Sequence, residues 1–307
     1  MVRPYEGAGS AAAVAPADVR FQLRDYAVLL KPRVMALVVF TGLVGLVMAP
    51  VPLPSLTAII AVACIALGAG AAGAINMWYD RDIDRVMQRT KNRPLPAGRL
   101  QPQVALRLGA GLATFAVVTM ALVVNLLAAG LLALTIIYYV LIYTVWLKRR
   151  TPQNIVIGGA SGALPPVIGW AAATGSVGIE ALSLFAIIFL WTPPHSWALA
   201  LFRRQDYDQA GVPMLPVVAG GRKTRLYILA YTLLLIPATL LPWAIGMAGV
   251  LYGIVALVLD AVLLLHVVRL AGDPRTQPAR TLFLFSILYL FLIFVALLAD
   301  RAFMGHG

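Results

Sequence analysis

The sequence predicts an all-α, polytopic membrane protein built as a bundle of nine transmembrane helices. Two observations lead to this fold class. The chain of 307 residues is 61% hydrophobic and only 12% charged, whereas soluble domains are roughly 45 to 50% apolar. Its apolar residues gather in successive runs, each of about 20 residues, the length at which a helix crosses a hydrocarbon core. The spans are therefore helices and not the shorter strands of a barrel.

The elements follow in a regular order along the chain. Residues 1–22 are rich in Ala, Gly and charge, so we expect a disordered tail and not a signal peptide. Residues 23–307 are expected to form a single intramembrane domain. Proline pairs at 165–166 and 193–194, with Pro237 and Pro242, are expected to distort three of the helices. The nine spans are predicted at residues 34–51, 56–79, 103–124, 127–147, 153–173, 179–201, 224–246, 249–269 and 281–299.

The basic residues indicate how the chain is oriented. Of the 24 lysines and arginines, 23 fall in the N-terminal tail or in alternate loops, and Arg301 alone falls on the other side. By the positive-inside rule, the N-terminus and these loops face the cytoplasm. The protein is expected to lie in the cell (inner) membrane. Because the bases alternate with apolar runs, no nucleic-acid partner is expected. The single cysteine, Cys64, lies within a span, which argues against disulfides and a thiol nucleophile.

A polar stripe follows the second span. Asn76, Asp80 and Asp84 recur at every fourth residue, so on a helix they lie on one face. Polar groups at a membrane boundary are costly unless they serve a partner, and spaced carboxylates can hold Mg²⁺ together with phosphate oxygens. The plainer alternative is a solvated helix end. The stripe is thus our first candidate for a catalytic, metal-binding site.

A second acidic stretch lies in a loop predicted to be on the same side. Of its two aspartates, Asp206 is favoured over Asp208 as a metal ligand, because it sits a turn before the helix-breaking A-G-V-P. A surface acid paired with Arg203 or Arg204 is the alternative. Arginine and lysine are the usual phosphate ligands. Four bases near these acids complete the predicted site for magnesium and diphosphate: Arg93, Arg99, Lys148 and Arg149.

His195 and Asp260 are ionisable residues that lie well inside predicted spans. His195 follows a Pro-Pro pair in WTPPH and could bind an iron porphyrin, accept a proton, or bond a backbone carbonyl freed by the prolines. Asp260 lies near the middle of the eighth span, where an isolated charge is expensive. It is expected to face the bundle interior, in its protonated form.

Several motifs resemble one known family. The stripe of Asn76, Asp80 and Asp84, followed by NRPLPAGR, is similar to the first aspartate motif of the UbiA superfamily of intramembrane prenyltransferases. Four further stretches resemble its protoheme IX farnesyltransferase (heme O synthase) branch: YTVWLKRRTPQNIVIGGA at 143–160, PPVIGW at 165–170, WTPPH at 191–195 and DYDQAGVPMLP at 206–216. The resemblance runs from about residue 31 to the last span.

This resemblance implies a nine-helix bundle around a central cavity and transfer of a farnesyl group from farnesyl diphosphate to a vinyl group of heme b. It implies that Asn76, Asp80 and Asp84 hold the diphosphate through Mg²⁺ and that Asp206 supplies a second metal-binding locus. It also implies that Arg93, Arg99 and Lys148 neutralise the leaving group, and that His195 contacts heme. Tyr143, Trp146 and Trp170 could shield an allylic cation or belong to the interfacial aromatic belt. A heme A synthase or an oxidase assembly factor is a candidate partner beside the lipid bilayer.

Two alternatives stay open from the residues. The nearest is prenyl transfer to a quinone precursor or a chlorophyll-type acceptor at the same diphosphate site. The residue four after Asp206 is Ala210, where many superfamily members carry a second acid, which leaves the number of metal ions undecided. A secondary transporter is the remote alternative, which the kinked helices and the intramembrane acid Asp260 suggest. Transporter sites usually lie near the bilayer midplane, whereas nearly all acids of this chain gather at the predicted cytoplasmic helix ends.

Overall fold

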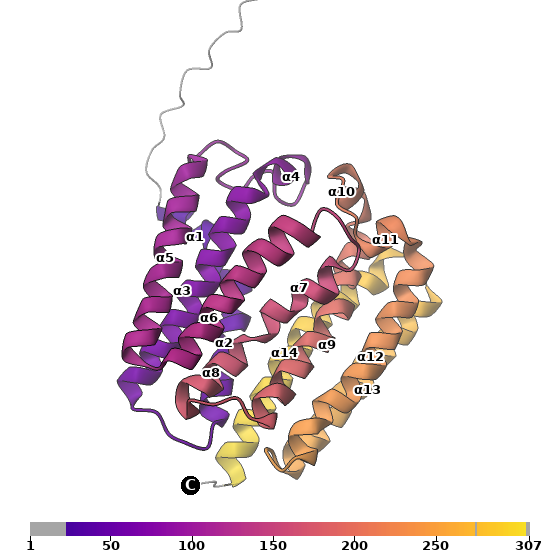
Figure 1. The fold of residues 1–307 in the computed structure, drawn as a ribbon. Coiled ribbons are helices and arrows are strands. Elements are labelled where there is room, and N and C mark those ends of the chain that lie inside the picture. The colour runs from indigo at the N-terminus through magenta and orange to yellow at the C-terminus, as the bar shows by residue number, and fades with distance from the viewer. Residues whose placement is uncertain (1–22, 274, 305–307) are drawn as a thin grey trace, which may run out of the picture.

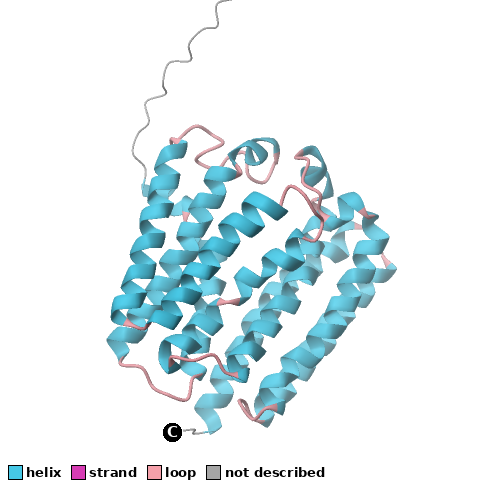
Figure 2. Ribbon diagram, in the orientation of Figure 1, coloured by secondary structure: helices cyan, strands magenta, loops and turns pink. Residues whose placement is uncertain are grey.

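The computed structural model describes residues 23–273 and 275–304, and the predicted tail at 1–22 lies outside this range. The described chain is a bundle of helices joined by loops, without strands (Figures 1 and 2). Eight helices are long and apolar enough to cross a membrane, and a bent pair makes up to nine. The predicted fold class is therefore confirmed. Seven of the eight are α3 (Ser55–Tyr79), α5 (Pro102–Val123), α6 (Leu126–Ile137) continued by the π-helix η1 (Tyr138–Leu147), α9 (Ile179–Phe202), α12 (Gly220–Ala244), α13 (Val250–Gly272) and α14 (Thr276–Met304). The eighth is the span Asn154–Thr174.

Helices are interrupted before a proline at two places. The helices α1 (Leu23–Leu29) and α2 (Pro32–Met48) meet at a bend of 53°, which lies just before the first predicted span at 34–51. The fifth predicted span, 153–173, consists of α7 (Asn154–Ala163) and α8 (Pro165–Thr174). In each case the next helix begins with a proline, which has no backbone N–H to donate to the preceding turn, so the helical hydrogen bonds are interrupted there. The helices α9 and α12 instead continue through their prolines, so those expected distortions do not end a helix.

The broken span α7–α8 lies between two groups of helices. In Figure 1 the helices from α1 to α6 form one side of the bundle, and α9 and α12–α14 form the other. The α8 helix packs closely on α2, since a Cβ added to Gly45 would lie 2.1 Å from the carbonyl oxygen of Pro166. No side chain fits there, so glycine lets the two backbones meet.

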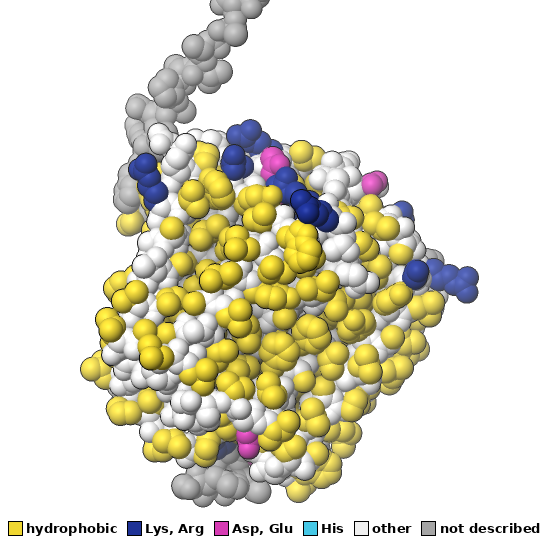
Figure 3. All heavy atoms as spheres, viewed as in Figure 1, with side chains coloured by type: hydrophobic (Ala, Val, Ile, Leu, Met, Phe, Trp, Pro, Cys, Tyr) yellow, Lys and Arg dark blue, Asp and Glu magenta, His cyan; other side chains and the backbone are white. Residues whose placement is uncertain are grey.

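The surface divides into an apolar belt and one charged end. Hydrophobic side chains cover the middle of the molecule, and most visible Lys and Arg side chains gather at one end (Figure 3). Three short helices lie at that end: α4 (Arg81–Val86), α10 (Arg204–Gln209) and α11 (Leu215–Val218). We call this the charged end. The belt matches the hydrocarbon core that the sequence predicts around the protein.

Asp260 lies inside the bundle, as predicted, in a network of hydroxyl groups. Its Oδ1 accepts a hydrogen bond from Tyr289 (2.5 Å), and its Oδ2 lies 2.7 Å from the Thr239 hydroxyl. That hydroxyl also lies 2.7 Å from the carbonyl oxygen of Ile236. Thr239 has one proton for these two acceptors. Every group in the network has a partner when Asp260 carries a proton on Oδ2 and donates it to Thr239. These hydrogen bonds join α12, α13 and α14.

Two substitutions of Asp260 test whether its carboxyl group is protonated or charged. We expect Asp260→Asn to keep near-wild-type thermal stability in detergent, because the amide donates to Thr239 and accepts from Tyr289. Asp260→Leu is expected to cost about 1–3 kcal/mol, because the buried Tyr289 hydroxyl loses its acceptor. Thermal unfolding of both variants measures the difference. Equal destabilisation by Asn and Leu would contradict the neutral form.

Candidate active site

The predicted stripe is present and buried at the charged end. Asp80 caps α3, and its amide donates to the carbonyl of Asn76, while the amide of Asp84 donates to the carbonyl of Asp80. The helical repeat therefore continues across the junction of α3 and α4. The side-chain amide of Asn76 donates to Oδ2 of Asp80 (2.8 Å). All three side chains are buried, so this is not the solvated helix end of the alternative interpretation.

Each carboxylate of the stripe has a basic partner. Lys148 donates to Oδ2 of Asp80, and Arg93 donates to Oδ2 of Asp84 at 2.7 Å. The side-chain amide of Asn76 also donates to the Thr144 hydroxyl of η1 (3.1 Å). Two of the four predicted bases thus lie directly on the stripe. Acids and bases in contact are the arrangement that a magnesium diphosphate requires.

Arg149 lies on the outer side of the stripe. It donates two hydrogen bonds to Asp82 (2.7 and 2.8 Å), and it lies 3.6 Å from Oδ1 of Asp80. These bonds from Arg149 lower the pKa of Asp82 to about 2, so the pair is ionised at neutral pH. Arg149 also stacks over the ring of Tyr79, 4.9 Å from its centroid. In this state its guanidinium is engaged mainly by the exposed Asp82.

Arg99 lies apart from the stripe. It donates to both carboxylate oxygens of Asp25 on α1 (3.0 and 3.1 Å) and to the carbonyl of Asn92. With Arg93 it lines a pocket of about 430 Å³ beside α1. The structure therefore brings Arg93 and Lys148, but not Arg99, into contact with the predicted acids.

Two buried carboxylate oxygens lack hydrogen-bond donors. They are Oδ1 of Asp80 and Oδ2 of Asp206. The nearest base to Asp206 is Arg203, at 3.9 Å. A buried carboxylate oxygen without a hydrogen-bond donor is costly. A cation would satisfy it, so these two oxygens are suited to bind Mg²⁺. Within residues 23–273 and 275–304 no three acidic, His or Cys side chains form a metal cluster, so a bound ion would need further ligands from substrate or water.

Lys31 belongs to the site although we did not predict it there. Its ammonium group donates to Oδ1 of Asn76 (2.7 Å). It is the one non-glycine residue in the described chain with a positive φ, 51°, which costs free energy for a side chain of this kind. The strained backbone at the bend between α1 and α2 directs Lys31 to Asn76. The following Pro32 was the only local signal for this geometry.

Removing the Lys31 ammonium tests its contribution. We expect Lys31→Met to lower the catalytic rate by about 10- to 100-fold, because Asn76 loses the donor that orients it. Arg107→Met is the matched control, since Arg107 is an exposed base at the start of α5 and should keep the wild-type rate. A Lys31→Met enzyme as fast as this control would contradict a role for Lys31. The steady-state rate of product formation measures both variants.

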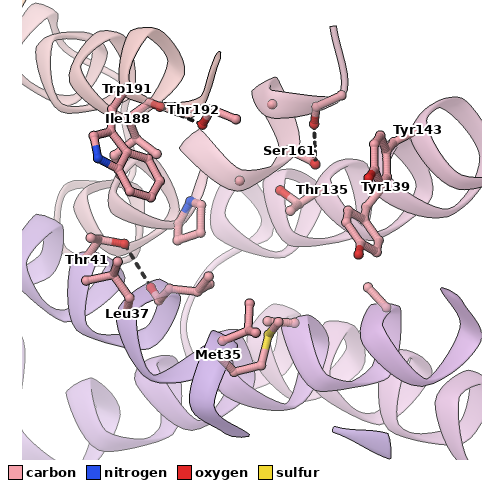
Figure 4. Close-up of a pocket in the computed structure, with 18 of the residues that line it drawn as sticks. Met35, Leu37, Thr41, Thr135, Tyr139, Tyr143, Ser161, Ile188, Trp191 and Thr192 are labelled. Carbon is pink, nitrogen blue, oxygen red and sulfur yellow. Dashed lines mark hydrogen bonds between the residues drawn. The ribbon is translucent and has the colours of Figure 1, made fainter. Parts of the chain in front are cut away.

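An apolar cavity of about 460 Å³ opens inside the bundle. Figure 4 shows its walls: α2 contributes Leu37 and Thr41, η1 contributes Tyr139 and Tyr143, and α9 contributes Trp191. The size is within the range of small-molecule sites. Tyr143 directly precedes Thr144, the hydroxyl that binds Asn76. The η1 helix therefore connects the cavity wall to the polar stripe.

The predicted aromatic and histidine residues separate into different environments. His195 and Tyr143 both line the cavity. Trp146 is exposed on the outer surface, whereas Trp170 is buried in the core outside the cavity wall. His195 stacks on Trp191, with ring centroids 4.3 Å apart. Of the three aromatics considered for cation shielding, only Tyr143 faces the cavity.

Sequence comparison identifies the family. Residues 38–297 match the UbiA prenyltransferase family. The protoheme IX farnesyltransferase of Acidiphilium cryptum is 58% identical over 286 residues, covering 90% of each chain. The protoheme IX farnesyltransferase of Granulibacter bethesdensis is 54% identical over 286 residues, again covering 90% of each chain.

Solved structures show the same fold. A digeranylgeranylglyceryl phosphate synthase superposes with a TM-score of 0.76 at 19% identity, covering 91% of this chain and 98% of that one. A UbiA homologue from Archaeoglobus fulgidus, bound to DMAPP and Mg²⁺, has a TM-score of 0.63 at 15% identity, covering 89% and 99%. The chain belongs to the UbiA prenyltransferase family, in the branch of the protoheme IX farnesyltransferases, and is a prenyl-transferring enzyme of the membrane.

Proposed function

We propose that this enzyme transfers the farnesyl group of farnesyl diphosphate to a vinyl group of heme b, forming heme O. One observation carries the proposal: an apolar cavity with a histidine on its wall is joined, through η1, to a buried stripe of acids and bases. The cavity suits a prenyl chain and a porphyrin, and the stripe suits a diphosphate. The names of relatives at 54 to 58% identity support the same substrates.

The stripe is proposed to hold the diphosphate. Asp80 and Asp84 would bind Mg²⁺ at the stripe, and Asp206 would bind it at a second locus. The metal, when bound, supplies positive charge to the leaving group. The Archaeoglobus homologue, which shares the fold, is bound to DMAPP and Mg²⁺, and this supports a prenyl diphosphate and a divalent metal as the ligands of the present site. Lys148, Arg93 and Lys31 lie on the stripe and would donate to the diphosphate oxygens. Arg149 and Arg99, which pair with Asp82 and Asp25, would have to turn from these partners to reach it.

The chemical step is a substitution at the allylic carbon. The C1–O bond breaks, and the diphosphate leaves with the electron pair as preorganised positive charges meet its growing negative charge. The vinyl π electrons of heme then form the new C–C bond. Water adds to the resulting porphyrin-stabilised cation and loses a proton, giving the hydroxyethylfarnesyl group. Tyr143 would shield the allylic cation with its ring, while the apolar walls keep water away until the vinyl group attacks.

The charged end is proposed to face the cytoplasm. The excess of Lys and Arg at this end follows the positive-inside rule. The diphosphate group of farnesyl diphosphate would then lie at the cytoplasmic end of the cavity, and both farnesyl diphosphate and heme b would enter from the cell membrane. We further propose that residues 23–307 act as one intramembrane domain, and that a heme A synthase or an oxidase assembly factor accepts the product.

The assay that tests this function uses the purified protein with Mg²⁺, heme b and farnesyl diphosphate. Hydroxyethylfarnesyl heme, detected by mass spectrometry, is the expected product, and chelation of the metal with EDTA should abolish its formation. A hydroxybenzoate and a naphthoate serve as competing acceptors. Turnover of either aromatic acid without any heme product would overturn the assignment in favour of a quinone-type prenyltransferase.

A further inference from the structure

The hydrogen bonds around His195 define which ring nitrogen carries its proton. His195 Nδ1 lies 2.7 Å from the hydroxyl of Ser286 on α14. That hydroxyl also lies 2.8 Å from the carbonyl oxygen of Phe283. A serine hydroxyl has one proton, and a carbonyl oxygen can only accept. The Ser286 proton therefore goes to Phe283, and the Ser286 oxygen accepts from Nδ1–H.

The opposite nitrogen of the ring is left with a free lone pair. Among the described residues, Nε2 of His195 has no hydrogen-bond partner, and no acidic side chain pairs with the ring. In these apolar surroundings the neutral imidazole is the form that fits. A neutral imidazole protonated at Nδ1 presents Nε2 as an electron-pair donor, which is the usual way in which histidine binds a metal.

The imidazole is also held rigidly. Its ring stacks on Trp191 and on Phe283, with centroid distances of 4.3 and 4.7 Å. The indole N–H of Trp191 donates to the carbonyl of Ser286 (2.8 Å). Both the hydroxyl and the backbone of Ser286 are thus tied to α9, and Ser286 itself is buried. The position and the tautomer of His195 are defined from two helices.

From this geometry we infer that Ser286 is a positioning residue, which holds His195 so that Nε2 coordinates the iron of the porphyrin acceptor. The inference rests on the proposed function, because it takes heme as the acceptor. Axial coordination anchors the iron at His195 on the wall of the cavity that Tyr143 also lines. The porphyrin is thereby held in one place while its vinyl group meets the allylic carbon. Ser286 itself touches neither substrate.

Binding of two porphyrins to the full-length protein in detergent distinguishes coordination from packing. Ferric heme b can be coordinated, whereas metal-free protoporphyrin IX has the same shape but no iron. We expect Ser286→Ala and His195→Ala to weaken heme binding by about 10- to 100-fold and to change its Soret and EPR signature. Neither variant should alter protoporphyrin binding, measured by fluorescence. Ser286→Thr, which keeps the hydroxyl, should restore the heme signature.

Ser183→Ala is the matched control. Ser183 is likewise buried and donates to the carbonyl three residues before it, Glu180 (2.6 Å), but it does not contact His195. The Ser183→Ala variant should bind heme and protoporphyrin as the wild-type protein does. If Ser286→Ala weakens the binding of heme and of protoporphyrin equally, or leaves the heme spectrum unchanged, the inference is overturned. The proposed function still stands in that case if the wild-type protein forms heme O. A wild-type protein that binds no heme and makes no heme O would overturn both.

Discussion

The variant Asp80→Asn is expected to lose prenyl transfer by about 10²- to 10³-fold or more while it still folds. Asp80 is 1% exposed, accepts from Asn76 and Lys148, and has one oxygen without a donor. An amide has nearly the same shape but no charge, so it binds a cation weakly. Product formation from heme b and farnesyl diphosphate measures the rate, and thermal unfolding checks the fold.

The control for this variant is two residues away in sequence. Asp82→Asn removes a charge from the same segment, but the Asp82 side chain is 63% exposed and is paired with Arg149. It should retain most of the wild-type rate, because an exposed pair contributes little. The burial of Asp80, and not the local charge, then accounts for the difference. Near-wild-type activity of Asp80→Asn would return the stripe to a structural role.

Lys148→Met is expected to have the second largest effect, a loss of about 10²-fold in kcat. Its ammonium group lies on Asp80, and its side chain is 18% exposed. A charge held in place before the reaction stabilises the leaving diphosphate without the cost of reorganisation. The methionine keeps the apolar stem and most of the length of the side chain, and it removes the charge. Steady-state rates over a range of farnesyl diphosphate concentrations separate the loss in kcat from one in KM.

Arg150→Met controls for the loss of one positive charge from this loop. Arg150 is exposed and neighbours the site only in sequence, so its removal should change the rate little. Lys148→Arg should recover part of the activity, since it restores the charge with a different geometry. Equal rates for Lys148→Met and Arg150→Met would show that the loop contributes only to membrane orientation.

Much of the fold could be predicted because each membrane span is indicated by a short, continuous segment of the sequence. An apolar run of about 20 residues has few alternatives in a bilayer, where every backbone group must be bonded within its own helix. All nine predicted spans therefore correspond to described helices, although the fifth is divided at Leu164. The break before Pro165 follows a local signal. That α9 passes through Pro193 and Pro194 intact depends on its neighbours, so it was not predictable from the prolines alone.

The site was predictable only in part, for the same reason. The spacing of Asn76, Asp80 and Asp84 is a local property, and the structure keeps it across the end of α3. Which bases meet these acids is not local. Lys31 reaches Asn76 across 45 residues, and Arg99 pairs with Asp25 across 74. Sequence proximity favoured Arg99 and gave no hint of Lys31.

The sequence by itself determined that this is a membrane bundle of helices with acids and bases at one end. Hydrophobic length, helical period and charge placement are properties of short segments, so they can be predicted without knowing how the segments pack. Tertiary structure decided which partners the acids take and which nitrogen of His195 is free. Those outcomes depend on contacts between helices distant in sequence, such as α9 and α14, whose hydrogen bond joins residues 91 positions apart.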